Sequence, residues 1–282
     1  MILFKHSKDL RFRLDKIKQK KLSVGFVPTM GALHPGHISL IKKSKEQADI
    51  TLCSIYVNPA QFNSPEDFRK YPVNIEADIL MLEESGCDIL FIPGGEEIYP
   101  DENSKKKHFD IGYLETILEG KFRPGHFQGV CMVVEKLLNI IEPTHLFLGQ
   151  KDYQQSLIIK KLVGMMSKNI KITICPTLRE PNGLAMSSRN LRLSNPEKGI
   201  AAELHKSLVQ MNHKLYAEGI QILKNQATSE LERLGFKIDY LEIATISDLE
   251  IIEKYKNRQG LIILIAAFLN NVRLIDNLIL SA

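Results

Sequence analysis

The chain has 282 residues, of which 44% are hydrophobic and 25% charged, and its net charge is +4. The longest apolar stretch, which begins at Gly260, is far shorter than the about 20 residues needed to cross a bilayer, and the length suits one large domain or two smaller ones. Aromatic residues make up 7% and tryptophan is absent, which argues against the basic, aromatic face of a nucleic-acid-binding protein, so we expect neither a membrane nor a nucleic acid as partner.

The first half of the chain alternates apolar runs of strand length with amphipathic stretches. A helix is expected to begin with Ser7 as its N-cap, with Leu10, Leu14 and Ile17 on one face. The strands predicted after it cover residues 23–29, 50–58, 87–93, 144–149 and 170–177. The helices predicted between these strands cover 37–48, a segment from about Asn74, 129–141 and a segment from about Asp152. Since strands separated by such helices form right-handed crossovers, residues 1–176 are predicted to be a Rossmann-like α/β domain with a doubly wound parallel sheet.

The remainder, residues 177–282, is predicted to be a smaller C-terminal α+β domain. It opens with a segment rich in Pro, Asn, Ser and Arg, which indicates a linker that also carries function. Ser194 is expected to cap one long helix, followed by a second helix near Leu223. The apolar stripe of the long helix consists of Ile200, Leu204, Leu208, Met211 and Leu215. The segment from Gly260 predicts two strands joined by the pair 270–271, since asparagine tolerates positive φ better than most residues do.

The segment "HPGH", with His34 and His37, lies where a strand ends and a helix begins. At that edge of a parallel sheet ligands bind, and unpaired N–H groups at a helix start favour a phosphate. Gly36 would let a ligand approach the backbone, and two imidazoles on one face of the first turn could donate hydrogen bonds to phosphate oxygens. Two histidines could also bind a metal, but no third ligand with suitable spacing is apparent, so no metal site is predicted.

Two further motifs point to the same edge. "LGQKDYQQS" follows a strand and enters a helix, which would bring Gly149, Lys151 and Asp152 close to the histidines, with Lys151 as a charge partner for phosphate. "AMSSRN" at 185–190 offers two hydroxyls and a guanidinium suited to triphosphate oxygens. No P-loop motif is present, so ATP phosphates would be bound by His, Lys, Ser and Arg side chains.

The motifs occur in an order that resembles one enzyme family. They are "PTMGALHPGH", "SIYVNPAQF", "LEGKFRPGHFQGV", "GQKDYQQ", "REPNGLAMSSRN" and "RLIDN". With them the chain resembles, over essentially its whole length, the AMP-forming pantoate–β-alanine ligases of the H-x-G-H nucleotidyltransferase superfamily. The resemblance implies attack of the pantoate carboxylate on the ATP α-phosphate with release of pyrophosphate, then attack of the β-alanine amine on the pantoyl adenylate with release of AMP. It also implies Mg²⁺ with the ATP and a homodimer.

The resemblance assigns roles to individual residues. The catalytic residues are expected to be His37, His34 and Lys151, and the resemblance gives the catalytic role to His37 and an assisting role at the phosphates to His34. The residues that it assigns to ATP are Met30, Gly31, His34, Gly36, His37, Gly149, Lys151, Asp152, Leu178, Met186, Ser187, Ser188 and Arg189. It gives Gln61 and Gln155 to pantoate, and Gln61 also to β-alanine. A neutral amide is physically sensible there, because it can recognise hydroxyls without fixing a charge beside the reacting carboxylate.

Some features leave alternatives open. Gln150 stands where many family members have Glu, and Arg123 and His126 of "KFRPGH" have no certain role. An H-x-G-H nucleotidyltransferase that adenylylates a different small acceptor would share the histidines but should lack the two-glutamine site and the C-terminal domain. A non-enzymatic RNA-binding protein is the remaining alternative, and the low aromatic content argues against it.

The N-terminus and the cysteines bear on the cellular compartment. The first residues have apolar side chains first and charges afterwards, the reverse of a secretory signal, so we expect a cytoplasmic protein. The cysteines are far apart and form no C-x-x-C pair, which predicts buried free thiols; they are Cys53, Cys87, Cys131 and Cys175.

Overall fold

The structure, a computed structural model, describes residues 1–101, 107–215, 218–254 and 260–280, and its larger sheet has six parallel strands in the order β1-β4-β3-β2-β5-β6. These strands are β1 (Ile2–Phe4), β2 (Val24–Thr29), β3 (Ile50–Ile55), β4 (Ile89–Phe91), β5 (His145–Gly149) and β6 (Lys171–Cys175). The strand order reverses between β2 and β5, which makes this the switch point of a doubly wound sheet. The predicted Rossmann-like parallel sheet is confirmed, although the short edge strand β1 was not expected.

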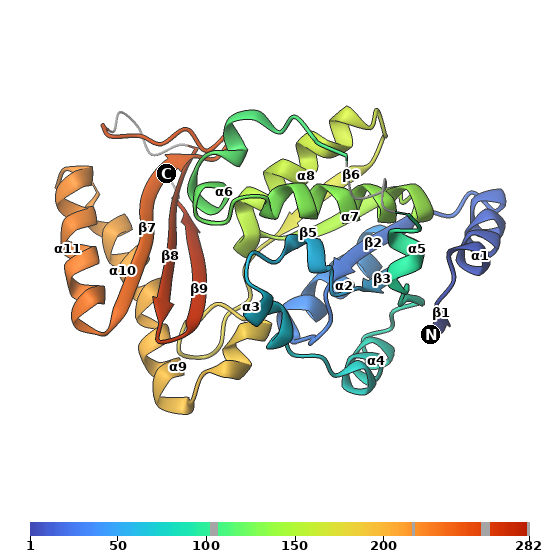
Figure 1. The fold of residues 1–282 in the computed structure, drawn as a ribbon, viewed down its shortest axis with the longest axis horizontal. Helices are drawn as coiled ribbons and strands as arrows, with labels where there is room; N and C mark the ends of the chain where they lie inside the picture. The colour runs from blue at the N-terminus through green and yellow to red at the C-terminus, as the bar shows by residue number, and fades with distance from the viewer. Residues whose placement is uncertain (102–106, 216–217, 255–259, 281–282) are drawn as a thin grey trace.

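Helices cover both faces of this sheet (Figure 1). The helices of this part are α1 (Ser7–Gln19), α2 (Pro35–Gln47), α3 (Pro65–Arg69), α4 (Ile75–Glu84), α5 (Gly95–Ile98), α6 (Leu118–Phe122), α7 (His126–Ile141) and α8 (Tyr153–Met165). Its 3-10 turns include η1 (Pro59–Gln61), η3 (Gly112–Glu115) and η4 (Gln150–Asp152). Since successive side chains of a strand point to opposite faces, Phe26 and Val27 of β2 lie in different cores. Phe26 packs with α1, α7 and α8, whereas Val27 packs with α2 and α4.

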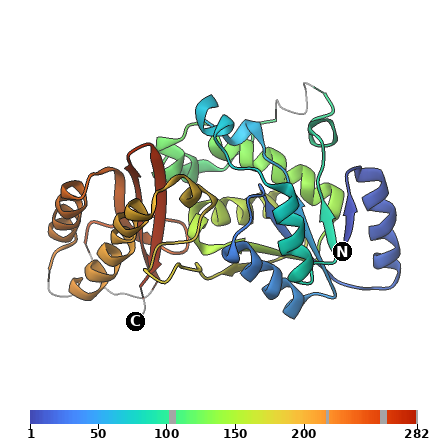
Figure 2. The same ribbon diagram turned by 90° about the horizontal axis from the view of Figure 1, so that it is seen from below.

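A second, antiparallel sheet of three strands stands beside the first (Figure 2). It consists of β7 (Phe236–Thr245), β8 (Leu261–Leu269) and β9 (Val272–Ile279). One face is covered by α10 (Glu203–Lys214) and α11 (Ile220–Arg233), and the other packs against α6 and α8. The remaining elements, η5 (Ser188–Arg192) and α9 (Asn195–Ala201), lead into α10.

Several predictions about single elements need correction. The N-cap of α1 is His6 rather than Ser7, and α2 begins at Pro35, two residues earlier than expected. The long helix predicted after Ser194 is interrupted at Ala202, so that α9 and α10 are separate, and nothing in the structure explains the break. Strand β7 was not predicted, because a register shift between Ile238 and Tyr240 breaks its alternation of apolar and polar residues.

Other predictions are confirmed. The face of α1 with Leu10, Leu14 and Ile17 is buried, and Asn74 caps α4 by accepting a hydrogen bond from the backbone of Ala77. Strands β8 and β9 meet at a turn in which Asn270 has a φ of 52°. All four cysteines are buried and free. In the described part of the chain, no helix combines the length and apolar character needed to span a bilayer.

The approach of α7 to the turn η1 depends on Gly129. A Cβ atom at this position would lie 2.2 Å from the carbonyl oxygen of Ala60. The Asn58 side chain reinforces the contact, since its Nδ2 donates to the carbonyl oxygen of Gly129 over 3.0 Å. Glycine here therefore sets how close η1 lies to the helix.

Gly129→Ala should destabilise the protein by about 1–3 kcal/mol, because the added methyl group must push backbone away. Gly164→Ala is the control: this glycine of α8 has no atom within 4 Å of an added Cβ, so the substitution should stabilise by about 0.5–1 kcal/mol. Urea unfolding of both variants measures the difference. Equal stability of the two would contradict the packing role of Gly129.

Candidate active site

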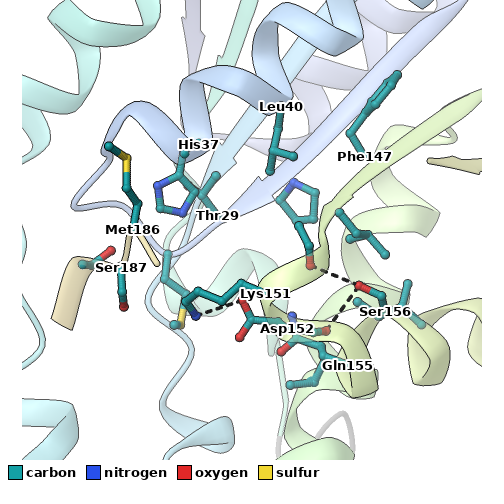
Figure 3. A pocket seen from close by; sticks show the side chains of 18 of the residues that line it. Thr29, His37, Leu40, Phe147, Lys151, Asp152, Gln155, Ser156, Met186 and Ser187 are labelled. Atoms are coloured by element: carbon teal, nitrogen blue, oxygen red, sulfur yellow. Dashed lines mark hydrogen bonds and ion pairs between the residues drawn. The ribbon is translucent and has the colours of Figure 1, made fainter. Parts of the chain in front are cut away.

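A cavity of about 220 Å³ lies beyond the carboxyl ends of β2 and β5, and Figure 3 shows side chains from several elements around it. Of the residues expected at the site, those lining it are Met30, His34, Gly36, His37, Gln61, Gly149, Lys151, Asp152, Gln155, Leu178, Met186, Ser187, Ser188 and Arg189. The fold thus brings together residues from the start of α2, η1, the turn between β5 and α8, and the segment that follows β6. Gly31 is the exception, since it does not line the cavity.

The two histidines form a reciprocal cap at the start of α2. The Nδ1 atom of His34 accepts a hydrogen bond from the backbone of Gly36 over 3.1 Å, and the Nδ1 atom of His37 accepts one from the backbone of His34 over 3.4 Å. In neutral rings with Nδ1 as acceptor, the proton is on Nε2, so each ring retains one N–H donor. The N–H groups of Gly36 and His37 are both occupied, which contradicts the expectation of unpaired N–H groups at this helix start.

Both imidazoles are neutral near pH 7. Burial and then the charges of His37 and Lys151 lower the pKa of His34 to about 3. Burial and the charge of Lys151 lower the pKa of His37 to about 4. The pair therefore offers hydrogen-bond donors rather than positive charge.

The loop between β2 and α2 is held by Asp78 of α4. This buried carboxylate accepts hydrogen bonds from the backbones of Ala32 and Leu33 over 2.9 and 2.7 Å. Gly31 has a φ of 78° and its backbone donates to Thr29 Oγ1 over 3.2 Å, so it shapes the loop. Sequence reasoning missed Asp78, because no motif marks it.

The turn that carries Lys151 is held by Asn277 of β9. The Nδ2 atom of this buried asparagine donates to the carbonyl oxygens of Gln150 and Lys151 over 2.9 and 3.0 Å. In return, Nε2 of Gln150 donates to Asn277 Oδ1 over 3.1 Å. The role of Gln150 is thus a contact with the second sheet. The block "RLIDN" contains Asn277 but did not reveal this role.

The adjacent glutamines of α8 have different surroundings. Gln154 is buried, and its side chain accepts from the backbone of Glu119 and donates to the carbonyl oxygens of Leu114 and Ile117. Gln155 lines the cavity and has no side-chain hydrogen bond to the rest of the described chain (Figure 3). Its amide is therefore available to a ligand.

The side chain of Gln61 is oriented by two neighbours. Asn58 Nδ2 donates to Gln61 Oε1 over 3.2 Å, and Gln61 Nε2 lies 2.8 Å from the sulfur of Met30. Asn58 in turn accepts a hydrogen bond from the hydroxyl of Tyr99 over 3.0 Å. Gln61 is buried at the cavity wall, so it is not merely an exposed polar residue of a loop.

The segment with the two serines joins this cavity to a second one of about 490 Å³, and the residues shared by both are Lys151, Asp152, Ser187 and Arg189. Ser188 Oγ donates to the carbonyl oxygen of Ala32 over 3.0 Å. This hydrogen bond connects η5 to the loop between β2 and α2, which leads to His34 and His37 and is called the histidine loop below. Asp67 of α3 forms ion pairs with both Arg189 and Arg192, with nitrogen–oxygen distances of 2.9 Å each. Arg189 is therefore already paired with an anion.

The low pKa values of His34 and His37 predict a pH dependence of stability. Unfolded histidine has a pKa of about 6.5, so between about pH 4 and pH 6.5 the unfolded chain binds more protons than the folded one. Acidification through this range should lower the free energy of unfolding, and the stability should be fully present above it. A variant with His34→Gln and His37→Gln should lose less stability than the wild type between pH 7 and about pH 4.5 in urea titrations. Equal losses in the two proteins would contradict neutral, buried imidazoles.

Known proteins match the chain along its length. The family model for pantoate-beta-alanine ligase matches residues 2–279. A pantothenate synthetase of Cytophaga hutchinsonii is 46% identical over 283 residues, which cover 99% of each chain. The crystal structure of pantothenate synthetase from Thermus thermophilus has a TM-score of 0.92 at 34% identity and covers 100% of both chains. The pantoate-beta-alanine ligase from Francisella tularensis has a TM-score of 0.83 at 39% identity, with 100% of this chain and 98% of that one covered. The chain therefore belongs to the pantoate–β-alanine ligase family.

Proposed function

We propose that this protein is an AMP-forming ligase that joins pantoate to β-alanine at the expense of ATP. In the first step a pantoate carboxylate oxygen bonds to the α-phosphorus of ATP, and pyrophosphate leaves. In the second the β-alanine amine bonds to the acyl carbon, the carbon–oxygen bond breaks and AMP leaves with that oxygen. The observation that carries the proposal is the cavity at the switch point, where imidazole N–H donors, a lysine and two glutamine amides surround one space.

The phosphate end of the cavity would serve the first step. We assign the Nε2–H groups of His37 and His34 to the phosphate oxygens, because neutral donors can follow charge that builds there without adding a fixed charge of their own. Lys151 would supply positive charge toward the α-phosphate and the departing pyrophosphate, since its partner Asp152, 3.3 Å away, is half exposed and easily solvated. The hydroxyls and guanidinium of 187–189 would complete the triphosphate site.

Other ATP contacts follow from the same arrangement. Met30 and Gly36, which are close in sequence to the histidines, also line the cavity. So do Gly149, which precedes Lys151, and Met186, which precedes the serines. Leu178 would meet the adenine. The Francisella tularensis relative is described as complexed with β-γ ATP and β-alanine, which supports both ligands here.

Another part of the cavity wall suits pantoate. The amides of Gln61 and Gln155 face it, and helix α7 adds an apolar wall of Val130, Val133, Val134 and Leu137. Pantoate carries hydroxyls together with a dimethyl-substituted carbon, so one face of it would bind amides and the other apolar side chains. Gln61 would also serve β-alanine, because its amide contacts Met30 of the loop between β2 and α2 and it lines the same cavity as this wall.

Magnesium would enter with ATP rather than reside in the protein. Among the described residues no cluster of three or more His, Cys, Asp or Glu side chains could hold a metal ion, and Asp152 is the one carboxylate found in the cavity lining. The donor set therefore fits Mg²⁺ held mainly by phosphate oxygens, where it would neutralise their charge. Asp152 would be the protein group nearest to it.

Three broader assignments complete the proposal. Residues 1–176 and 177–282 would be two domains, which is supported by separate apolar clusters, one within residues 10–163 and another within 184–280. Family membership supports a homodimer and a cytoplasmic location. Transfer of AMP to a different small acceptor is the alternative, and the names of the relatives do not favour it.

Product analysis tests the reaction. Incubation with ATP, Mg²⁺, pantoate and β-alanine should yield pantothenate, AMP and pyrophosphate by mass detection, and formation of ADP would rule out the adenylate.

Lys151→Ala should lower the rate of adenylation by about a hundredfold or more, the usual scale for one electrostatic partner of a transition state. Lys160→Ala, at an exposed position of α8, is the matched control and should leave the rate unchanged.

Gln155→Glu should weaken pantoate binding by about 2–4 kcal/mol, because it replaces an amide donor by a negative charge beside the pantoate carboxylate or hydroxyls. ATP binding should change much less. Gln155→Met, which removes the hydrogen bond without adding charge, should give a smaller loss. Separate titrations of ATP and pantoate decide the assignment: unchanged pantoate affinity, or an equal loss for ATP, would mean that Gln155 faces something else.

A further inference from the structure

The corner between α6 and α7 holds the main chain of Gln61. His126, the first residue of α7, is buried, and its Nδ1 atom lies 2.8 Å from the carbonyl oxygen of Gln61. Its Nε2 atom lies 3.0 Å from Nη1 of Arg123. Since a guanidinium can only donate, Nε2 must accept, and Nδ1–H must donate to Gln61. The ring is therefore neutral, with both nitrogen atoms paired.

Its surroundings keep this imidazole neutral. Burial, and then the charge of Arg123, lower the pKa of His126 to about 3. Arg123 also approaches the carbonyl oxygen of Gln61, with Nη2 at 3.4 Å. Both side chains thus contact the same backbone atom, the carbonyl oxygen of Gln61, whose side-chain amide faces the cavity.

Arg123 is itself connected to the C-terminal sheet. Glu119 of α6 is buried and binds both Nη atoms of Arg273 from β9, over 2.8 Å each. It also accepts from the hydroxyl of Tyr240 in β7 over 2.9 Å and from Arg123 over 3.4 Å. Burial alone would raise the pKa of Glu119, but hydrogen bonds with Arg273 and the two arginine charges hold it at about 2. The carboxylate is thus a fixed anion that joins α6 to the second sheet. Figure 1 shows α6 beside this sheet.

We propose that His126 is a positioning residue. It fixes the main chain at Gln61 and, through Arg123, Glu119 and Arg273, links the part of the cavity assigned to pantoate to the second sheet. The proposal rests on the assignment of Gln61 to pantoate and β-alanine. Its structural basis is a continuous series of hydrogen bonds from β9 to η1. Arg273 and Arg123 both donate to the Glu119 carboxylate, Arg123 also donates to His126, and His126 donates to the carbonyl oxygen of Gln61. A shift of β9 relative to α6 would therefore change the position of the Gln61 main chain.

Two substitutions of His126 separate positioning from general packing. His126→Leu keeps the volume but removes the donor to Gln61, whereas His126→Asn places an amide N–H close to the former Nδ1 position. We expect His126→Leu to weaken pantoate binding by about tenfold or more, the scale for a buried acceptor that loses its donor, with ATP affinity changed less than about threefold. The pantoate KM should rise more than kcat falls. His126→Asn should recover most of the pantoate affinity.

Gln128→Leu is the matched control on the same helix. Gln128 binds the backbone of Phe109 through both amide atoms and donates to Glu115, so its loss removes hydrogen bonds of α7 but none to η1. It should lower stability without a selective effect on pantoate. Arg123→Met provides a second test if His126→Leu does not fold, because Glu119 keeps Arg273; it should also raise the pantoate KM selectively.

The results separate failure of this inference from failure of the proposed function. If the wild type does not form pantothenate, the proposed function fails whatever the variants do. If the wild type is active and His126→Leu binds pantoate normally, or loses pantoate and ATP affinity equally, His126 is not a positioning residue. Failure of His126→Asn to bind pantoate better than His126→Leu would contradict the assigned hydrogen bond to Gln61.

Discussion

Parallel pairing of β2 with β5 is the constraint on which the site depends. Gly25 and Phe26 are in register with His145 and Leu146, so both strands end at the same edge of the sheet. Because the strand order reverses here, the connections that leave the two strands diverge and open a space between them. The histidine loop follows β2 and the turn with Lys151 follows β5, which explains how motifs far apart in sequence share one cavity.

The charges around that cavity are distributed unevenly. The histidines are neutral, and Arg189 is paired with Asp67, which also receives Arg192. Phosphate binding at Arg189 would therefore exchange one anion for another, whereas Lys151 has only a half-exposed partner. Water can solvate the half-exposed Asp152 carboxylate when Lys151 turns to a ligand, so Lys151 is the more readily available positive charge. Arg192 also donates to the carbonyl oxygen of Asn271, and could keep Asp67 paired while Arg189 moves to a ligand.

How far the sequence predicted the molecule depends on the range of the interactions. The parallel sheet was predictable because its strands are short apolar runs between helical stretches, and the motif residues because each is marked by its immediate neighbours. The residues that hold the motifs in place were not: Asp78, Asn277 and Glu119 act on segments distant in sequence, through contacts that only the fold creates. Strand β7 was missed because the register shift between Ile238 and Tyr240 breaks its alternation of apolar and polar residues. Asp239, which lies at this shift, pairs with Arg273 of β9, and this contact too exists only in the fold.

Transfer of oxygen from pantoate to AMP is the most direct measure of the proposed chemistry. Pantoate labelled with ¹⁸O in its carboxylate would be converted in a single incubation with ATP, Mg²⁺ and β-alanine, and the nucleotide and phosphate products analysed by mass. If the carboxylate attacks the α-phosphorus and the amine later breaks the carbon–oxygen bond, one labelled oxygen must appear in AMP. AMP without the label, or label in inorganic phosphate together with ADP, would contradict a pantoyl adenylate and with it the roles given to the histidines and Lys151.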